Sequence, residues 1–123
     1  MQLNWIWIGL GAVLGAWARH GANLWVQWKG WPHPWATLGV NWLGALLIGL
    51  ALSAQLSRAW MSEEARLFLV TGFLGALTTF STYSWETLRL YHDKGLGTAT
   101  LYVLASNAGC LGLVWLGWKK FAL

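Results

Sequence analysis

The fold is decided by residues 72–86, which read GFLGALTTFSTYSWE and lie in the third of four apolar segments. Six Ser and Thr residues fall between Thr78 and Thr87, together with Glu86. Because each unpaired polar group costs free energy in hydrocarbon, we expect this segment to face protein or water and not lipid. An ionisable residue inside a membrane segment also marks a candidate functional site.

The composition is that of a membrane protein. Of the 123 residues, 57% are hydrophobic and 10% are charged, and the mean hydropathy is +0.47. A soluble domain carries about 25% charged residues. The twelve Trp residues fit the same class, because Trp concentrates where water meets lipid. We expect one domain over residues 1–123.

Four segments are long enough to cross the hydrocarbon core, which takes about 20 apolar residues in a helix. We place these spans at about residues 3–25, 35–56, 66–91 and 98–118. The connections between them are short, so neighbouring helices run antiparallel. The sequence therefore predicts an all-α membrane protein with four transmembrane helices per chain.

Basic residues are nearly balanced between the two ends of this bundle. Four lie on one side and three on the other: Arg58, Arg66, Lys119 and Lys120 against Lys29, Arg89 and Lys94. Because an excess of basic residues sets orientation, this balance predicts insertion in both directions and an antiparallel, dual-topology homodimer. The charges form no basic stripe, so we expect contacts with lipid headgroups and no nucleic-acid partner.

Motifs of soluble enzymes are missing from the sequence. It has no Gly-rich phosphate loop, no zinc-ligand spacing and no nucleophile elbow. Its four acids are too few for paired acid–base catalysis. A single cysteine, Cys110, excludes an intramolecular disulfide and is expected to be a small packing residue. We therefore expect a protein that is not an enzyme.

The third span is predicted to break near mid-membrane. Gly72, Gly75 and the pair Thr78-Thr79 tolerate or stabilise non-helical backbone. A break would free carbonyl oxygens, and two from each chain of a two-fold dimer would supply four oxygen ligands. Such ligands suit a hard cation such as Na⁺. The alternative is an unbroken helix whose glycines form a packing groove, and the residues favour neither.

One helical face after the expected break is polar. Thr79, Thr82, Tyr83 and Glu86 follow one another at helical spacing. The ring of Phe80, three residues before Tyr83, has a positive edge that can contact an anion. The alternatives are that the two rings only pack and that Glu86 is an interfacial acid.

Other spans contribute isolated polar residues. Asn41 lies in a charge-free run and needs a hydrogen-bond partner, so a bond between helices is the default and donation to a permeating anion the alternative. Arg19 is the only charge deep in the first span and is expected to clamp a helix end. Tyr102 and Ser106 either continue the polar line or make ordinary helix contacts, which we favour.

These residues resemble the bacterial fluoride channel family, the Fluc or CrcB proteins. The resemblance covers the length and four-span layout of the whole chain and is carried by GFLG at 72–75, TTFST at 78–82, Ser84, Glu86, GVN at 39–41, Gly44, Gly49, Gly15 and Arg19. It implies an antiparallel homodimer in the bacterial inner membrane, with two fluoride pores and a central, structural Na⁺ that is not transported. The implied function is passive export of cytoplasmic fluoride.

The resemblance also implies roles for single residues. By position, the backbone carbonyls of Gly75 and Thr78 would bind Na⁺. The fluoride pore would be formed by Asn41, Phe80, Tyr83, Ser81, Thr82, Glu86, Tyr102 and Ser106. Two departures from the family pattern bear on this site: Tyr83 replaces a usual Phe, and Ala76 replaces a usual Gly.

Two other functions compete with a channel. A small dual-topology, proton-coupled drug or cation exporter would have the same size, but such carriers resemble one another in a deep acid in the first span. Here that span holds Arg19 and no carboxylate. A non-conducting membrane subunit would leave the polar third span without a purpose.

Overall fold

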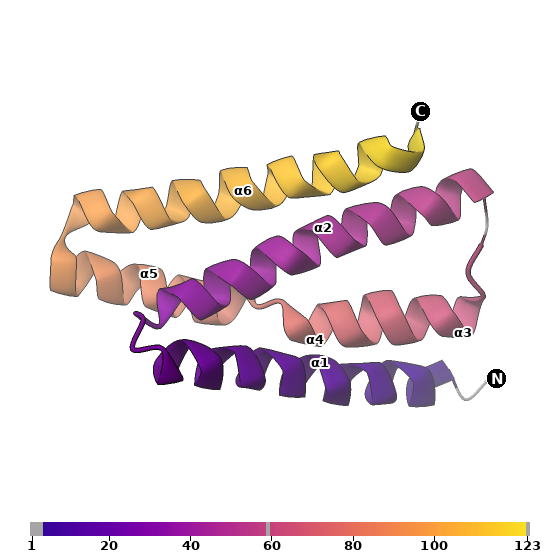
Figure 1. The fold of residues 1–123 in the computed structure, drawn as a ribbon, viewed down its shortest axis with the longest axis horizontal. Coiled ribbons are helices and arrows are strands. Elements are labelled where there is room, and N and C mark those ends of the chain that lie inside the picture. Colours follow the sequence, from indigo (N-terminus) through magenta and orange to yellow (C-terminus); the bar gives the residue numbers. More distant parts are fainter. Residues whose placement is uncertain (1–3, 59, 123) are drawn as a thin grey trace.

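A computed structural model describes residues 4–58 and 60–122, and no β-strand occurs among them. The elements are α1 (Asn4–Trp28), α2 (Pro34–Arg58), α3 (Glu63–Arg66), η1 (Leu67–Leu74), α4 (Gly75–Leu77), α5 (Phe80–Lys94) and α6 (Leu96–Ala122). In Figure 1, α1 and α6 form the two outer edges, with α2 and the segments from α3 to α5 between them. Both chain ends lie at the end of the bundle where α3 begins.

Glycine brings α1 against the first half of the third span. A Cβ atom on Gly11 would collide with the carbonyl of Phe68, and one on Gly15 with the carbonyl of Phe73. From the other side, a Cβ on Gly72 would collide with the backbone of α1. The two backbones are therefore in direct contact, as small residues permit in membrane helices.

A second close contact joins α2 to α6. Gly49 and Gly117 let these two backbones approach, and Gly109 leaves room for the indole of Trp42. The indole nitrogen Nε1 donates a hydrogen bond to the carbonyl of Ala105 at 3.1 Å. Indole N–H groups need such a partner away from water.

The third span is broken, which confirms the prediction and places the break at Thr78–Thr79. Helix α4 ends at Leu77, and the ψ angles of Thr78 and Thr79 are 154° and 119°. Thr79 then caps α5, because its hydroxyl accepts a hydrogen bond from the amide of Thr82 at 3.2 Å. Before the break the chain forms a π-helix over Leu67–Leu74, which the sequence did not predict.

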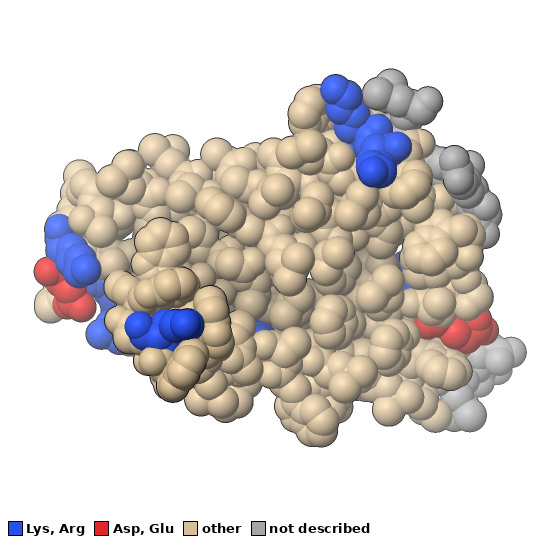
Figure 2. Space-filling model, in the orientation of Figure 1, with Lys and Arg blue, Asp and Glu red and all other residues tan. Residues whose placement is uncertain are grey.

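Three helical segments are long and apolar enough to cross a membrane: Pro34–Leu56, Glu63–Lys94 and Leu96–Phe121. Helix α1 has 25 residues, a length of about 37 Å at 1.5 Å per residue, but its polar residues and Trp lower its hydropathy. The four-span count therefore stays a prediction. In Figure 2 the charged side chains gather toward the two ends of the molecule, and the surface between them is almost free of charge.

Candidate functional site

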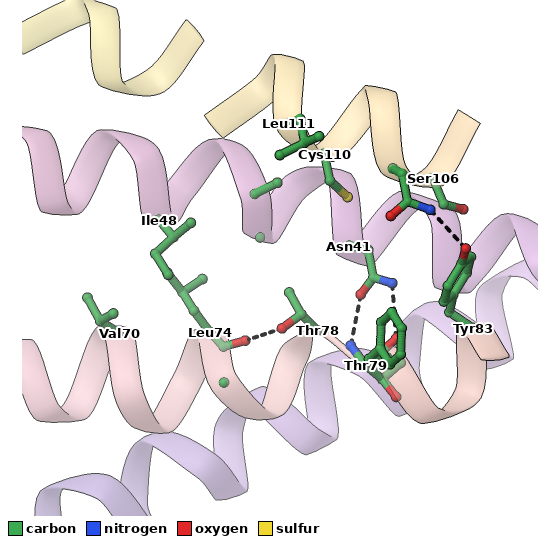
Figure 3. A pocket seen from close by; sticks show the side chains of 15 residues that line it. Asn41, Ile48, Val70, Leu74, Thr78, Thr79, Tyr83, Ser106, Cys110 and Leu111 are labelled. Carbon is green, nitrogen blue, oxygen red and sulfur yellow. Dashed lines mark hydrogen bonds between the residues drawn. The ribbon is translucent and has the colours of Figure 1, made fainter. Parts of the chain in front are cut away.

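A pocket of about 430 Å³, the central pocket, lies between α2, the broken third span and α6 (Figure 3). Its lining residues are Asn41, Gly44, Ala45, Ile48, Val70, Leu74, Gly75, Thr78, Thr79, Phe80, Tyr83, Ser106, Asn107, Cys110 and Leu111. Six of the predicted site residues are thus brought together: Asn41, Gly75, Thr78, Phe80, Tyr83 and Ser106. The remaining predicted residues do not line this pocket: Ser81, Thr82, Glu86, Tyr102 and Arg19.

Asn41 holds the broken backbone in place. Its Oδ1 accepts a hydrogen bond from the amide of Thr79 at 2.8 Å, and its Nδ2 donates to the carbonyl of Thr79 at 3.1 Å (Figure 3). The expected bond between helices is therefore present. A carboxamide nitrogen carries two hydrogens, and no described residue accepts the second, so Asn41 keeps one donor at the pocket.

Hydroxyl groups gather where α5 begins. The Oγ1 of Thr79 donates to Oγ1 of Thr82 at 3.1 Å and lies 3.4 Å from the Oγ of Ser81. Thr79 is buried, Thr82 is half-buried and Ser81 is exposed. These three hydroxyl groups therefore lead from the protein surface to the buried break.

Aromatic rings and an amide from α5 and α6 contact one another beside the central pocket. The centroids of Phe80 and Tyr83 are 5.3 Å apart, and those of Tyr83 and Tyr102 are 5.5 Å apart. The hydroxyl of Tyr83 accepts a hydrogen bond from Nδ2 of Asn107 at 2.9 Å. Ser106 is buried and lines the central pocket, so its hydroxyl adds a polar group beside these rings.

Phe80 is exposed over 76% of its surface, although it lines the central pocket. Its ring lies against the ring of Tyr83, at a centroid distance of 5.3 Å, and most of its surface faces outward. The pocket is therefore open on the side of Phe80 in a single chain. A second protein surface or lipid has to cover it.

Glu86 is a buried carboxylate, with only 7% of its surface exposed. Its Oε1 accepts a hydrogen bond from the hydroxyl of Thr37 at 2.8 Å, and its Oε2 accepts one from the hydroxyl of Tyr102 at 2.7 Å. Both oxygens are thus satisfied by neutral donors from α2 and α6. The alternative of an interfacial, solvated Glu86 is wrong, because the carboxylate is held inside the bundle.

Arg19 lines a smaller pocket of about 280 Å³, the side pocket, together with Ala16, His20, Asn23, Thr37, Thr79 and Thr82. Thr79 lines both pockets, so only the turn at the break separates them. Within the described part of the chain, Arg19 makes no ion pair. Its expected role as a helix clamp stays a prediction.

The backbone at the break fits a cation with oxygen ligands. In an unbroken α-helix the amide of Thr79 would bond the carbonyl of Gly75, but it donates to Asn41 instead. The extended ψ of Thr78 turns its own carbonyl out of the helical direction. No cluster of His, Cys, Asp or Glu suited to a metal occurs among the described residues.

Comparison with known proteins identifies the family. Residues 6–118 match the family described as "CrcB-like protein, Camphor Resistance (CrcB)". The chain belongs to the CrcB family. This match spans all the helices that surround the two pockets and confirms the resemblance seen in the sequence.

Several CrcB relatives carry the name fluoride-specific ion channel FluC. The chain is 46% identical over 117 residues to the one from Bordetella petrii. This aligned region covers 95% of this chain and 90% of the relative. The chain is 41% identical over 116 residues to the one from Acidobacterium capsulatum (94% and 93% covered) and 46% identical over 117 residues to the one from Thermus thermophilus (94% and 91%). These relatives are named as channels and not as enzymes, in agreement with the missing catalytic motifs.

Two participants in this CrcB site were not predicted as site residues from the sequence. Thr37 donates a hydrogen bond to Glu86, and Asn107 donates one to the hydroxyl of Tyr83. Thr37 lies four residues before Asn41, so both are on one face of α2. That spacing is a signal that could have found Thr37.

Proposed function

We propose that this chain is a fluoride-selective, passive ion channel that exports cytoplasmic fluoride across the inner membrane. The proposal is supported by the names of its relatives and by the polar groups collected around the central pocket. The single observation that carries it is the Nδ2 of Asn41, which keeps one hydrogen to donate at a pocket that Phe80 also lines. Such a pocket presents donors to a small ligand.

The chemistry of the donors suits fluoride. A permeating ion must be bound strongly enough to enter and weakly enough to leave. Carboxamide N–H groups, hydroxyls and the positive edges of aromatic rings can replace the water around a small anion without the trapping effect of a full positive charge. We assign these roles to Asn41, to Phe80 with Tyr83, and to Ser106. Ser81, Thr82, Tyr102 and Glu86 continue the proposed path.

The proposed channel is an antiparallel homodimer in which each chain crosses the membrane four times. The exposed ring of Phe80 and the open central pocket support a partner on that face. The near balance of basic residues between the two ends supports both orientations. Helix α1 is long enough to be the fourth span.

We also propose a structural Na⁺ at the dimer axis that is not transported. The carbonyls of Gly75 and Thr78 from each chain would hold it, because the break leaves them outside the regular helical ladder. A bound cation would supply positive charge that stabilises the two breaks facing each other. In this chain, Asn41 keeps Thr79 turned away and so preserves the position of these carbonyls.

Fluoride efflux from liposomes that hold the pure protein tests the function. We expect fast, passive efflux of fluoride and no measurable efflux of chloride. Electroneutral drug–proton exchange would establish an exporter instead, and the absence of any flux would leave only a non-conducting subunit.

A pair of aromatic substitutions tests the proposed path. Phe80→Leu removes the ring edge at the central pocket, whereas Trp85→Leu removes another exposed ring of α5 that does not line it. We expect Phe80→Leu to lower fluoride efflux at least about fivefold, the equivalent of the roughly 1 kcal/mol that a good aromatic contact contributes. Dimer assembly, measured by size-exclusion chromatography, should persist. Equal efflux in both variants would remove Phe80 from the path.

A further inference from the structure

A pocket of about 560 Å³ lies at the opposite end of the third span from Glu86, and the proposed ion path does not use it. This interfacial pocket is lined by Trp7 of α1, by Trp60 and Met61 of the connection before α3, by Glu64, and by Phe68 and Leu69 of η1. It lies at the end of the bundle where both chain termini are found (Figure 1). There the apolar helices begin, so the pocket is at the level where lipid headgroups meet acyl chains.

The interfacial pocket is lined by one acid, Glu64, that makes no ion pair among the described residues. The neighbouring acid Glu63 is neutralised by Arg66, whose Nε and Nη2 donate to its two carboxylate oxygens at 2.9 and 2.7 Å. The carboxylate of Glu64 is a group of the pocket lining that can bind a cation.

The walls of the pocket select an organic cation. Faces of Trp rings attract ammonium groups, and Trp7 and Trp60 both present indoles there. Along the helix the lining changes from Glu64 to Phe68 and Leu69, about one turn deeper into the apolar part of the bundle. This gradient matches a molecule with a cationic head and an apolar tail.

We infer that the interfacial pocket binds a zwitterionic phospholipid through its ammonium headgroup. The ammonium would lie between the carboxylate of Glu64 and the indoles of Trp7 and Trp60. Phe68 and Leu69 would contact the beginning of an acyl chain. A soluble amine would leave these deeper apolar residues without a contact, and an anionic lipid would bring negative charge against Glu64.

Native mass spectrometry of the delipidated full chain tests this inference. The protein is mixed with equal amounts of phosphatidylethanolamine and phosphatidylglycerol that carry the same acyl chains, so only the headgroups differ. We expect the wild type to retain more phosphatidylethanolamine. Glu64→Gln should lower that retention about two- to fivefold, which corresponds to one exposed cation contact.

The double variant Glu63→Gln/Arg66→Gln is the control, because it removes the neighbouring acid together with the base that neutralises it, and neither residue lines the pocket. We expect it to keep the preference for phosphatidylethanolamine. Trp60→Leu provides a second variant and should lower the same signal, whereas Trp60→Phe should keep part of it. Equal retention of the two lipids by the wild type, or an equal loss in the double variant and in Glu64→Gln, would overturn the inference. The count of bound lipids needs no fluoride, so its failure is separable from failure of the channel proposal.

Discussion

The two halves of the third span use their residues in different ways. Before the break, residues 67–77 are almost wholly apolar and contact α1 through backbone atoms at Gly72. After the break, α5 joins α2 and α6 through side-chain hydrogen bonds at Glu86 and Tyr83. The first half is therefore held by close backbone packing at glycine, and the second by side-chain hydrogen bonds.

This difference separates stability from function along one polypeptide segment. A backbone contact tolerates no added atoms, so the first half depends on the absence of side chains. A polar network tolerates changes in volume better but leaves costly unpaired groups when one partner is lost. Substitutions in the two halves should therefore fail in different ways.

The largest effect is expected in the first half, at its contact with α1. Gly11→Leu forces a side chain into the carbonyl of Phe68, whereas a Cβ atom added at Gly9 on the same helix has open space around it. We expect Gly11→Leu to destabilise the protein by about 3 kcal/mol or more and to abolish a monodisperse peak in size-exclusion chromatography. Gly9→Leu should elute as the wild type does. Similar elution of the two variants would show that the first half of the third span does not depend on close backbone packing at Gly11.

Asn41→Asp tests the polar half at the break. The carboxylate can still accept from the amide of Thr79, but it cannot donate to the Thr79 carbonyl or to an anion. We expect fluoride efflux from liposomes to fall at least about tenfold, because a buried partner is lost and negative charge is added. Assembly should survive. Unchanged efflux would remove Asn41 from the ion path.

Thr37→Val sharpens the role of the buried carboxylate. The substitution keeps the shape of the side chain but removes the hydroxyl that donates to Glu86. We expect a loss of about 1–3 kcal/mol in stability, seen as a lower temperature of aggregation in detergent. Thr100→Val, at an exposed site on α6, should change stability by less than about 0.5 kcal/mol. A Thr37 variant as stable as the Thr100 variant would show that Glu86 does not need this donor.

Tyr83→Phe should give the smallest effect. It keeps the ring beside Phe80 but removes the hydroxyl that accepts from Asn107. Asn107 also donates to the carbonyl of Val103 at 2.9 Å, so its amide keeps one partner. We expect a change of about 1 kcal/mol or less in stability and fluoride efflux within about fivefold of the wild type. A complete loss of efflux would mean that the hydroxyl itself contacts the ion.

Much of the architecture could be predicted from the pattern of residues. Apolar runs of membrane length indicated the helices, because hydrocarbon accepts only segments with satisfied backbone groups. Gly11 and Gly15, four residues apart, have the spacing typical of close helix packing, and the structure places them against Phe68 and Phe73. The break was predicted only as one of two alternatives. The structure contradicts the unbroken helix, although Gly72 does pack against α1, six residues before the break.

The hydrogen-bond partners could not be predicted in the same way. The polar side chains of residues 78–87 predict a polar face. The hydrogen-bond donors to Glu86, however, come from α2 and α6, which are distant in the chain. Pairings of this kind depend on the relative rotation of the helices. The π-helix at 67–74 was missed for a similar reason: a local change of helical register is stabilised by contacts with other helices and has little sequence signal.

The amino-acid sequence by itself determined that this protein is helical and apolar, that one span is too polar for lipid, and that the chain resembles fluoride channels, because hydropathy, glycine spacing and motif order are local properties. Only the tertiary structure decided that the break lies at Thr78–Thr79, with Asn41 holding it, and that Thr37 and Tyr102 satisfy Glu86. The physical reason is that polar groups inside a bundle bond whichever partner the helix packing brings within about 3 Å.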